Sequence, residues 1–158
     1  MTKAINDLTL GMIKPHAVRA RKAGEIITRI ENAGFAILNV KAVQLRKEGA
    51  ALFYEEHKGK DFFPNLVNIM SSGTVWALVL AKQNAVEEFR KLIGATHPAE
   101  AEPGTIRHDY GDHSNITLNA IHGSANPEDS YREILFFFGS DLEKTRRCQE
   151  MDKQAKIS

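Results

Sequence analysis

One histidine of the sequence lies at a position from which its side chain could react with a substrate. His122 lies in the run Asn119-Ala120-Ile121-His122-Gly123-Ser124, between a strand-like stretch, residues 116–121, and a helix expected to begin near Asn126. A lone imidazole at a strand end, beside backbone N–H groups, can attack phosphorus and carry a phosphoryl group. The alternative is an ordinary surface or core histidine. The ordinary role is the commoner one for a histidine, and the strand-end position and the Gly-Ser that follows add support for a nucleophile.

Basic side chains that could hold phosphate fall at expected element ends or in loops. Lys14 ends the first strand, Arg90 lies on the helix after the third strand, and Arg107 lies with Thr105 in a long loop. Arginine can grip phosphate with two contacts and lysine offers a point charge, although each could also be merely solvated. The sequence has no Gly-x4-Gly-Lys-Ser/Thr loop, so side chains and magnesium would have to hold a nucleotide.

Other polar and aromatic residues admit two interpretations. Tyr54 and Phe62 could line a site, but from the residues alone ordinary core or helix packing is favoured. A group of acidic and imidazole side chains suggests a metal site, yet its spacing matches no standard ligand pattern and a solvated loop is favoured. The members of that group are His108, Asp109, Asp112 and His113.

The elements that must position these residues follow from apolar spacing and turn signals. Strands are predicted at 8–13, 35–45, 74–81 and 116–121. Helices are predicted at 23–33, 47–57, 65–70, 84–93 and 127–138, and residues 95–114 form a long loop. Gly34 and Gly94 are expected to end helices, whereas Asn84 and Asn126 are expected to cap helix N-termini.

This order of elements predicts an α+β fold. Two strand-helix-strand units in tandem give the split βαβ arrangement, a four-stranded antiparallel sheet with helices over one face and added short helices. Residues 1–139 form the predicted domain. Residues 140–158 are expected to be an extension, either a marginal helix or disordered.

Composition narrows the class of protein. The 158 residues, 42% hydrophobic, can bury one core, and 21 basic against 20 acidic residues leave a net charge of +1. Such a balance provides no general attraction to nucleic acid or anionic membranes, so any anion site must be local. The lone Cys148, the absence of a signal-like N-terminus and the short longest apolar run, 75–81, predict a soluble cytoplasmic protein without a membrane span.

Several motifs together resemble the nucleoside diphosphate kinase family, in the same order from about Leu8 to Phe138. They are Ile13-Lys14-Pro15, Tyr54 with Phe62-Phe63, Arg90, Gly94-Ala95-Thr96 with Pro98, Pro103-Gly104-Thr105-Ile106-Arg107, and Asn119-Ala120-Ile121-His122-Gly123-Ser124. The family's fold is the ferredoxin-like βαββαβ sheet with added helices, in agreement with the element order above.

The resemblance implies a ping-pong transfer of the γ-phosphoryl group from a nucleoside triphosphate to a diphosphate. His122 matches the nucleophile, which forms a pros-phosphohistidine, and Glu133 matches the residue that orients it. Lys14 and Tyr54 match other catalytic positions, and Mg²⁺ is expected to be held mainly by the phosphates rather than by protein ligands. The positions that match nucleotide contacts are Lys14, Phe62, Leu66, Arg90, Thr96, Arg107, Asn119 and Ser124.

The resemblance also implies partners. ATP, GTP, ADP and their deoxy forms are the expected ligands, and a homo-oligomer, tetramer or hexamer, is the expected assembly. Nucleic acid is not expected as the main partner. Two alternatives remain: a nucleotide-binding regulatory homologue with little turnover, and an ACT-like sensor that shares only the sheet topology.

The chain departs from the family pattern near the site. The family usually has Asp at His16, Gly at His108, Arg at Leu118 and Asp at Ala125, and residues 111–115 include about two extra residues. None of these departures removes a reacting group. They change what surrounds the reacting groups.

Overall fold

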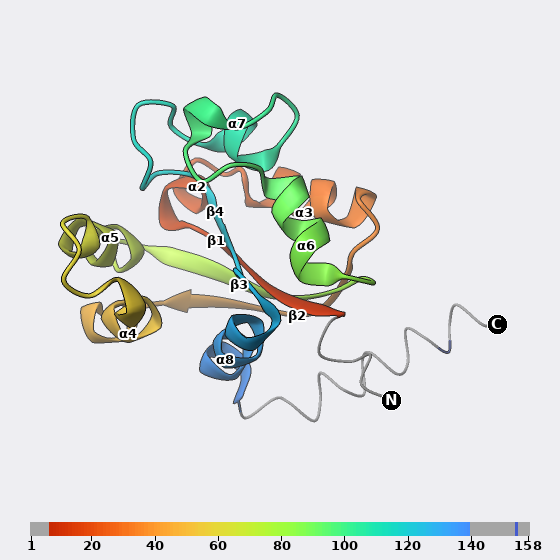
Figure 1. The fold of residues 1–158 in the computed structure, drawn as a ribbon, viewed down its shortest axis with the longest axis horizontal. Helices are drawn as coiled ribbons and strands as arrows, with labels where there is room; N and C mark the ends of the chain where they lie inside the picture. Colours follow the sequence, from red (N-terminus) through yellow and green to blue (C-terminus); the bar gives the residue numbers. More distant parts are fainter. Residues whose placement is uncertain (1–6, 140–153, 155–158) are drawn as a thin grey trace.

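A four-stranded antiparallel sheet forms the centre of the computed structural model, which describes residues 7–139 and residue 154 (Figure 1). Its strands are β1 (Leu8–Ile13), β2 (Ala36–Gln44), β3 (Thr74–Ala81) and β4 (Ile121–Gly123), in the spatial order β2-β3-β1-β4. Every neighbouring pair runs antiparallel. The predicted α+β class and split βαβ topology are confirmed.

Helices cover both faces of the sheet, so the prediction of a single covered face is wrong. The crossover helices α3 (Ala23–Asn32) and α6 (Ala85–Ile93) pack on one face, and α4 (Lys47–Phe53), α5 (Phe63–Met70) and α8 (Pro127–Phe138) pack on the other (Figure 1). The cause is visible in β1, where Leu10 and Met12 enter one core and Ile13 enters the other. Alternate residues of a strand face opposite sides, and here both sides are apolar.

The structure contains short helices that the sequence pattern does not predict. The predicted loop 95–114 contains the 3₁₀ helix η2 (Pro98–Glu100) and α7 (Ile106–Tyr110), and the unpredicted α2 (Pro15–Arg19) follows β1 directly. The predicted helix 47–57 divides into α4 and the 3₁₀ helix η1 (Glu55–His57). Elements this short carry too few apolar repeats for periodicity to reveal them.

The last strand lies later in the chain than predicted. β4 covers Ile121–Gly123 rather than 116–121, and it pairs with β1 so that His122 stands opposite Met12. Before it, the Asn115 side chain accepts a hydrogen bond from the Thr117 N–H at 3.0 Å. Local side-chain bonds of this kind compete with strand pairing and favour turns.

Helix ends agree with prediction at three positions and differ at one. Gly34 and Gly94 end α3 and α6 with φ of 93° and 88°, and the Asn126 side chain caps α8 by accepting from the Asp129 N–H at 2.7 Å. Asn84 instead precedes α6 in the left-handed region, at φ 55°, and its side chain makes no capping bond. Within the described residues, no helix is long and apolar enough to cross a membrane.

Candidate active site

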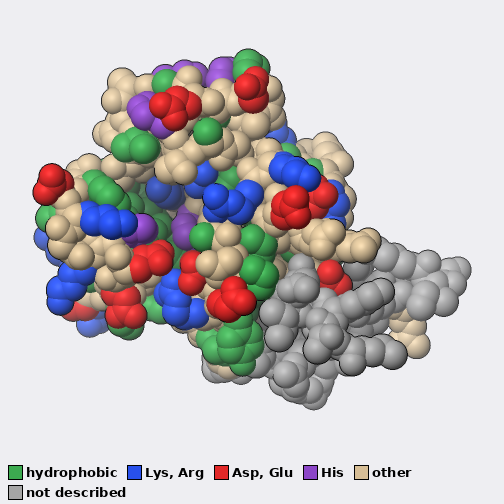
Figure 2. All heavy atoms as spheres, viewed as in Figure 1, with side chains coloured by type: hydrophobic (Ala, Val, Ile, Leu, Met, Phe, Trp, Pro, Cys, Tyr) green, Lys and Arg blue, Asp and Glu red, His purple; other side chains and the backbone are tan. Residues whose placement is uncertain are grey.

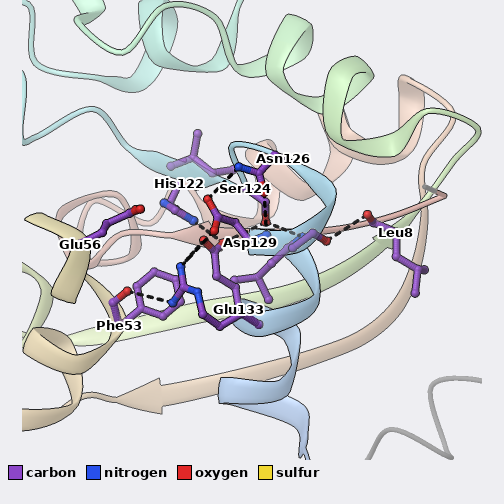
Figure 3. Close-up of polar contacts among 12 residues, drawn as sticks. Leu8, Phe53, Glu56, His122, Ser124, Asn126, Asp129 and Glu133 are labelled. Atoms are coloured by element: carbon purple, nitrogen blue, oxygen red, sulfur yellow. Dashed lines mark hydrogen bonds and ion pairs between the residues drawn. The ribbon is translucent and has the colours of Figure 1, made fainter. Parts of the chain in front are cut away.

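A buried carboxylate fixes the orientation of His122. The Nε2 atom of His122, on β4, lies 2.7 Å from Oε1 of Glu133, on α8 (Figure 3). The Glu133 side chain is only 3% exposed and that of His122 is 17% exposed. Because a carboxylate can only accept, the Nε2–H donates, and Nδ1 of a neutral ring keeps its lone pair.

Glu133 is itself held in the charged state. Burial raises the pKa of its carboxyl, but hydrogen bonds from His122 and Ser124 and the charge of Arg132 outweigh burial and leave the pKa below its ordinary value. The Ser124 hydroxyl donates to Oε1 at 2.9 Å and accepts the Leu10 N–H at 3.3 Å. Ser124 therefore lies buried behind His122, supporting Glu133, rather than among the residues that line the adjoining pocket.

A strained turn precedes the nucleophile candidate. The Ile121 N–H donates to the Asn119 carbonyl at 2.9 Å, and Ala120 between them has φ 73°. This is a γ-turn with positive φ at its centre, the rarer and more strained of the two γ-turn forms. Backbone strain of this kind costs on the order of 1–3 kcal/mol and is found mainly where function requires it.

The pocket beside His122 has a volume of about 300 Å³ and two walls of different character. One wall is apolar and aromatic, and the other is polar and basic (Figure 2 shows blue basic side chains and a purple histidine around the hollow). The apolar wall consists of Tyr54, His57, Phe62, Leu66 and Ile116. The polar wall consists of Lys14, Thr96, Arg107, Thr117 and Asn119.

Lys14 is the most deeply buried cation of the polar wall. Lys14 is the residue that follows β1. Its side chain donates to the Thr117 carbonyl at 3.2 Å, and its backbone N–H donates to the Ala120 carbonyl at 2.9 Å. Burial, reinforced by the charge of Arg107, lowers the pKa of Lys14 to about 7. An anion in the pocket would favour the charged form of this lysine.

Arg107, on α7, grips the backbone beside the nucleophile. Its Nε and Nη2 donate to the Ile121 carbonyl at 3.2 and 3.1 Å, and Nη1 donates to the Gly94 carbonyl at 3.0 Å. Burial, followed by the charge of Arg90, lowers its pKa to about 10. Arg90 is thus an electrostatic neighbour of Arg107, but it lines a second hollow with Ala125 and Asn126 rather than the pocket.

Two polar atoms facing the site have no hydrogen-bond partner among residues 7–139. They are the Tyr54 hydroxyl and Oδ1 of Asn119, whose Nδ2 donates to the Thr96 carbonyl at 2.9 Å. The Tyr54 ring meets His122 edge-on at 5.8 Å, and burial raises the pKa of its hydroxyl, which stays neutral. Buried polar groups are normally paired, so these two atoms are candidates for hydrogen bonds to a bound ligand.

Of the residues expected at the site, Lys14, Tyr54, Phe62, Leu66, Thr96, Arg107, Asn119 and His122 line the pocket together. Glu133 and Ser124 lie behind His122. Sequence reasoning missed three liners: His57, Ile116 and Thr117. His57 lies close to Tyr54 in the sequence, and this proximity could have indicated that it lines the pocket. Thr117 contributes a backbone carbonyl to Lys14, which no side-chain pattern reveals.

The side chains of the loop group suggested as a metal site make polar contacts with one another and with Arg29 and Ser114. His108 Nδ1 lies 2.7 Å from Asp109, which also pairs with Arg29, and these two contacts lower the pKa of Asp109 to about 2. Asp112 accepts from the N–H and hydroxyl of Ser114. Among the described residues no group of three or more His, Cys, Asp or Glu is placed to hold a metal ion.

Comparison with known proteins gives these features a family. Residues 7–142 match the family model described as nucleoside diphosphate kinase. A nucleoside diphosphate kinase of Legionella pneumophila (strain Paris) is 49% identical over 132 residues, covering 84% of this chain and 92% of that protein.

Solved structures agree. The Aquifex aeolicus nucleoside diphosphate kinase aligns with a TM-score of 0.81 at 38% identity, covering 84% of this chain and 94% of that chain. A halophilic nucleoside diphosphate kinase from Halobacterium salinarum, solved in complex with CDP, aligns with a TM-score of 0.79 at 38% identity, covering 84% of this chain and 88% of that chain. The fold, the pocket and these likenesses agree, and the chain belongs to the nucleoside diphosphate kinase family.

Proposed function

We propose that this chain transfers the γ-phosphoryl group of a nucleoside triphosphate to a nucleoside diphosphate through a phosphohistidine at His122. The observation that carries the proposal is the 2.7 Å bond from His122 Nε2 to Glu133, which leaves Nδ1, the pros nitrogen, as the nucleophilic atom. His122 also lines the pocket. Fold likeness alone would not assign this chemistry, because function depends on the site.

The transfer proceeds in two steps. The Nδ1 lone pair of His122 forms a bond to the γ-phosphorus, the bond from that phosphorus to the bridging oxygen breaks, and a nucleoside diphosphate leaves. A terminal oxygen of a second diphosphate then attacks the phosphorus, and the P–N bond breaks. The Glu133 carboxylate stabilises the positive charge that develops on the ring while Nδ1 bonds to phosphorus.

The polar wall is assigned to the phosphates. Lys14 and Arg107 place buried positive charge beside His122, where charge on the transferred group's oxygens must be stabilised. Thr96 supplies a hydroxyl in the same wall, and the unpaired Tyr54 hydroxyl can donate there. Arg90 lines the second hollow and is an electrostatic neighbour of Arg107, and we assign it to the phosphates with Arg107.

The apolar wall is assigned to the base. Phe62 is 43% exposed at the pocket, with Leu66 beside it, and stacking on a π-face accepts any base. Asn119 and Lys14 are assigned to the sugar hydroxyl nearest the phosphates. The expected substrates are therefore ATP, GTP, ADP and their deoxy forms.

Magnesium fits the chemistry of this pocket as an ion carried by the phosphates. The residues that line the pocket include no Asp or Glu, so they offer no carboxylate ligands for Mg²⁺. When bound, Mg²⁺ neutralises charge on the phosphate oxygens. Lys14 and Arg107 supply the remaining positive charge from the protein.

Further expectations concern assembly and location. We propose a cytoplasmic homo-oligomer, a tetramer or hexamer, for which light scattering gives the mass directly. We also propose residues 1–139 as the catalytic domain, whereas the predicted extension 140–158 lies outside the described residues apart from residue 154. A regulatory homologue with little turnover is the competing function, and it predicts tight nucleotide binding without phosphoryl transfer.

Labelling tests the proposal. Incubation with γ-labelled ATP is expected to give an acid-labile, alkali-stable phosphoprotein, and His122→Ala is expected to abolish the label. His113→Ala is the matched control, because His113 lies in the loop group and not at the pocket. Label that persists in the His122→Ala variant would overturn the assignment, and a folded wild-type protein that binds ADP without labelling would favour the regulatory function.

A further inference from the structure

An imidazole outside the pocket holds the γ-turn in front of His122. His16, on α2, lies with its Nε2 atom 2.9 Å from the N–H of Ala120, the central residue of that turn. The Ala120 carbonyl accepts the Lys14 N–H, so the strained peptide units are held from both sides. Without His16, the N–H of Ala120, a fully buried residue, would lose its acceptor.

The direction of this hydrogen bond fixes the protonation of His16. A backbone N–H can only donate, so Nε2 must carry a lone pair and the ring proton must reside on Nδ1. That Nδ1 atom is buried and has no hydrogen-bond partner within residues 7–139. The ring is therefore built to act as an acceptor, and only its neutral form can do so.

The surrounding charges keep the ring neutral. Burial, followed by the charges of Lys14 and Arg19, lowers the pKa of His16 to about 4. Asp112 and the Leu118 carbonyl oppose this shift weakly, and the carbonyl does not complete a hydrogen bond to Nδ1. These groups come from α2, the end of β1 and the segment before the turn.

We propose that neutral His16 is a positioning residue for phosphoryl transfer, which holds the γ-turn so that Asn119 and His122 keep their places in the pocket. The proposal rests on the function assigned above and adds a residue that touches neither nucleotide nor nucleophile. Protonation of His16 at Nε2 would place its N–H opposite the N–H of Ala120, break the hydrogen bond between them and release the turn. Transfer should then decline in acid because the turn is released.

Two substitutions separate the acceptor from the ring. His16→Gln can place an amide oxygen near the position of Nε2 and does not titrate, whereas His16→Leu fills space without an acceptor. At neutral pH, His16→Leu is expected to lower kcat roughly 10- to 100-fold, because small misplacements of reacting groups have effects of this size. KM should change much less. His16→Gln should recover most of kcat, and His113→Gln serves as the control for loss of a histidine.

A pH profile and nuclear magnetic resonance complete the test. From about pH 6 towards about pH 4, His16→Gln should lose less of its kcat than the wild type, because only the wild type titrates at this position. In ¹⁵N spectra of the wild type, His16 should carry its proton on Nδ1 at neutral pH. The ¹⁵N measurement uses the wild-type protein, so it depends neither on turnover nor on the folding of a variant.

The outcomes are distinct. A proton on Nε2 of His16, or wild-type kcat in folded His16→Leu, overturns the positioning role. Equal losses in the Gln and Leu variants also overturn it, because the ring's packing would then matter rather than its acceptor. Absence of phosphohistidine in the wild type would instead reject the proposed function, while the ¹⁵N result would still report on the bond to Ala120.

Discussion

The two walls of the pocket are held in place in opposite ways. On the polar wall, Lys14, Arg107 and Asn119 each donate to backbone carbonyls, so their positions are set before any ligand binds. On the apolar wall, Phe62 is 43% exposed and meets His57 only through a tilted ring contact at 5.3 Å. The wall assigned to chemistry is therefore fixed by hydrogen bonds, whereas Phe62, the residue assigned to the base, can adapt although Tyr54 and Leu66 in the same wall are buried.

This difference has an electrostatic origin. Burial lowers the pKa values of both Lys14 and Arg107, because removal from water disfavours their charged forms when no anion is bound. A polyphosphate relieves that cost, so the same residues disfavour the empty state and favour the bound one. Stacking on Phe62 involves no comparable desolvated charge. Substitutions in the polar wall should thus affect rate, and substitutions in the apolar wall should affect binding.

The largest effect is expected from the polar wall. Arg107→Ala removes a buried cation and three donated bonds that hold the Ile121 and Gly94 carbonyls. Loss of one preorganised charge-stabilising donor typically lowers kcat roughly 10²- to 10³-fold, and steady-state assays should show a loss of this size. Arg46→Ala, at an exposed arginine before α4, is the control. A loss confined to KM would contradict the division between the walls.

A smaller loss of rate is expected when the support of His122 is weakened. Glu133→Gln keeps an oxygen that can accept from Nε2 but removes the buried negative charge that stabilises the developing charge on the ring. By analogy with carboxylates that orient metal-bound histidines, kcat should fall roughly 10- to 100-fold. Rapid-quench measurement of phosphohistidine formation checks this. A normal rate of formation would show that geometry alone suffices.

The apolar wall should respond differently. Phe62→Ala removes a stacking surface, which is worth about 1–3 kcal/mol per base. Because Phe62 is partly exposed, we expect an effect of about 1 kcal/mol, or roughly 5-fold in KM. The value of kcat should change little. Leu52→Ala, at a 56% exposed leucine on α4, is the matched control. A loss of kcat larger than the rise in KM would show that the aromatic wall also positions the reacting groups.

What the sequence predicted depends on how local the deciding interactions are. The start of α8 was predicted because the cap, Asn126, and Pro127 are adjacent in the chain. The last strand was misplaced because the Asn115 side chain bonds to the Thr117 N–H and turns a β-branched stretch away from the sheet. Propensity cannot register that competition, since it depends on one specific hydrogen bond.

The site shows the same division. The cluster of eight expected residues was predicted through motifs, although their shared pocket is formed only by the fold. Ile116 was expected within a strand and instead lines the pocket, because β4 begins later. The link between His16 and Ala120 joins residues 104 positions apart, and no sequence spacing points to it. Long-range polar contacts of this kind are among the features that sequence reasoning missed.

The smallest expected effect concerns the protonation of Lys14. Because its pKa is about 7 in the empty pocket, a nucleotide should bind with uptake of up to about one proton above that pH. Affinity for ADP should weaken roughly 3-fold between about pH 6.5 and 7.5, and calorimetry in buffers of different ionisation enthalpy measures the proton directly. Lys14→Met should abolish the part of the uptake that belongs to this lysine, leaving that of the phosphate itself.

The stability of the nucleotide-free protein tests the same shift with the opposite sign. Unfolded lysine, with a pKa of 10.5, holds a proton that folded Lys14 releases above about pH 7. Between these values the unfolded state binds more protons, so Lys14's contribution to the free energy of unfolding should rise with pH, and its full cost should be present below pH 7. The free energies of unfolding of the wild type and Lys14→Met, measured with urea across this pH range, should converge as pH rises. A constant difference would mean that Lys14 stays charged in the empty pocket, and the polar wall would then bind phosphate without a proton.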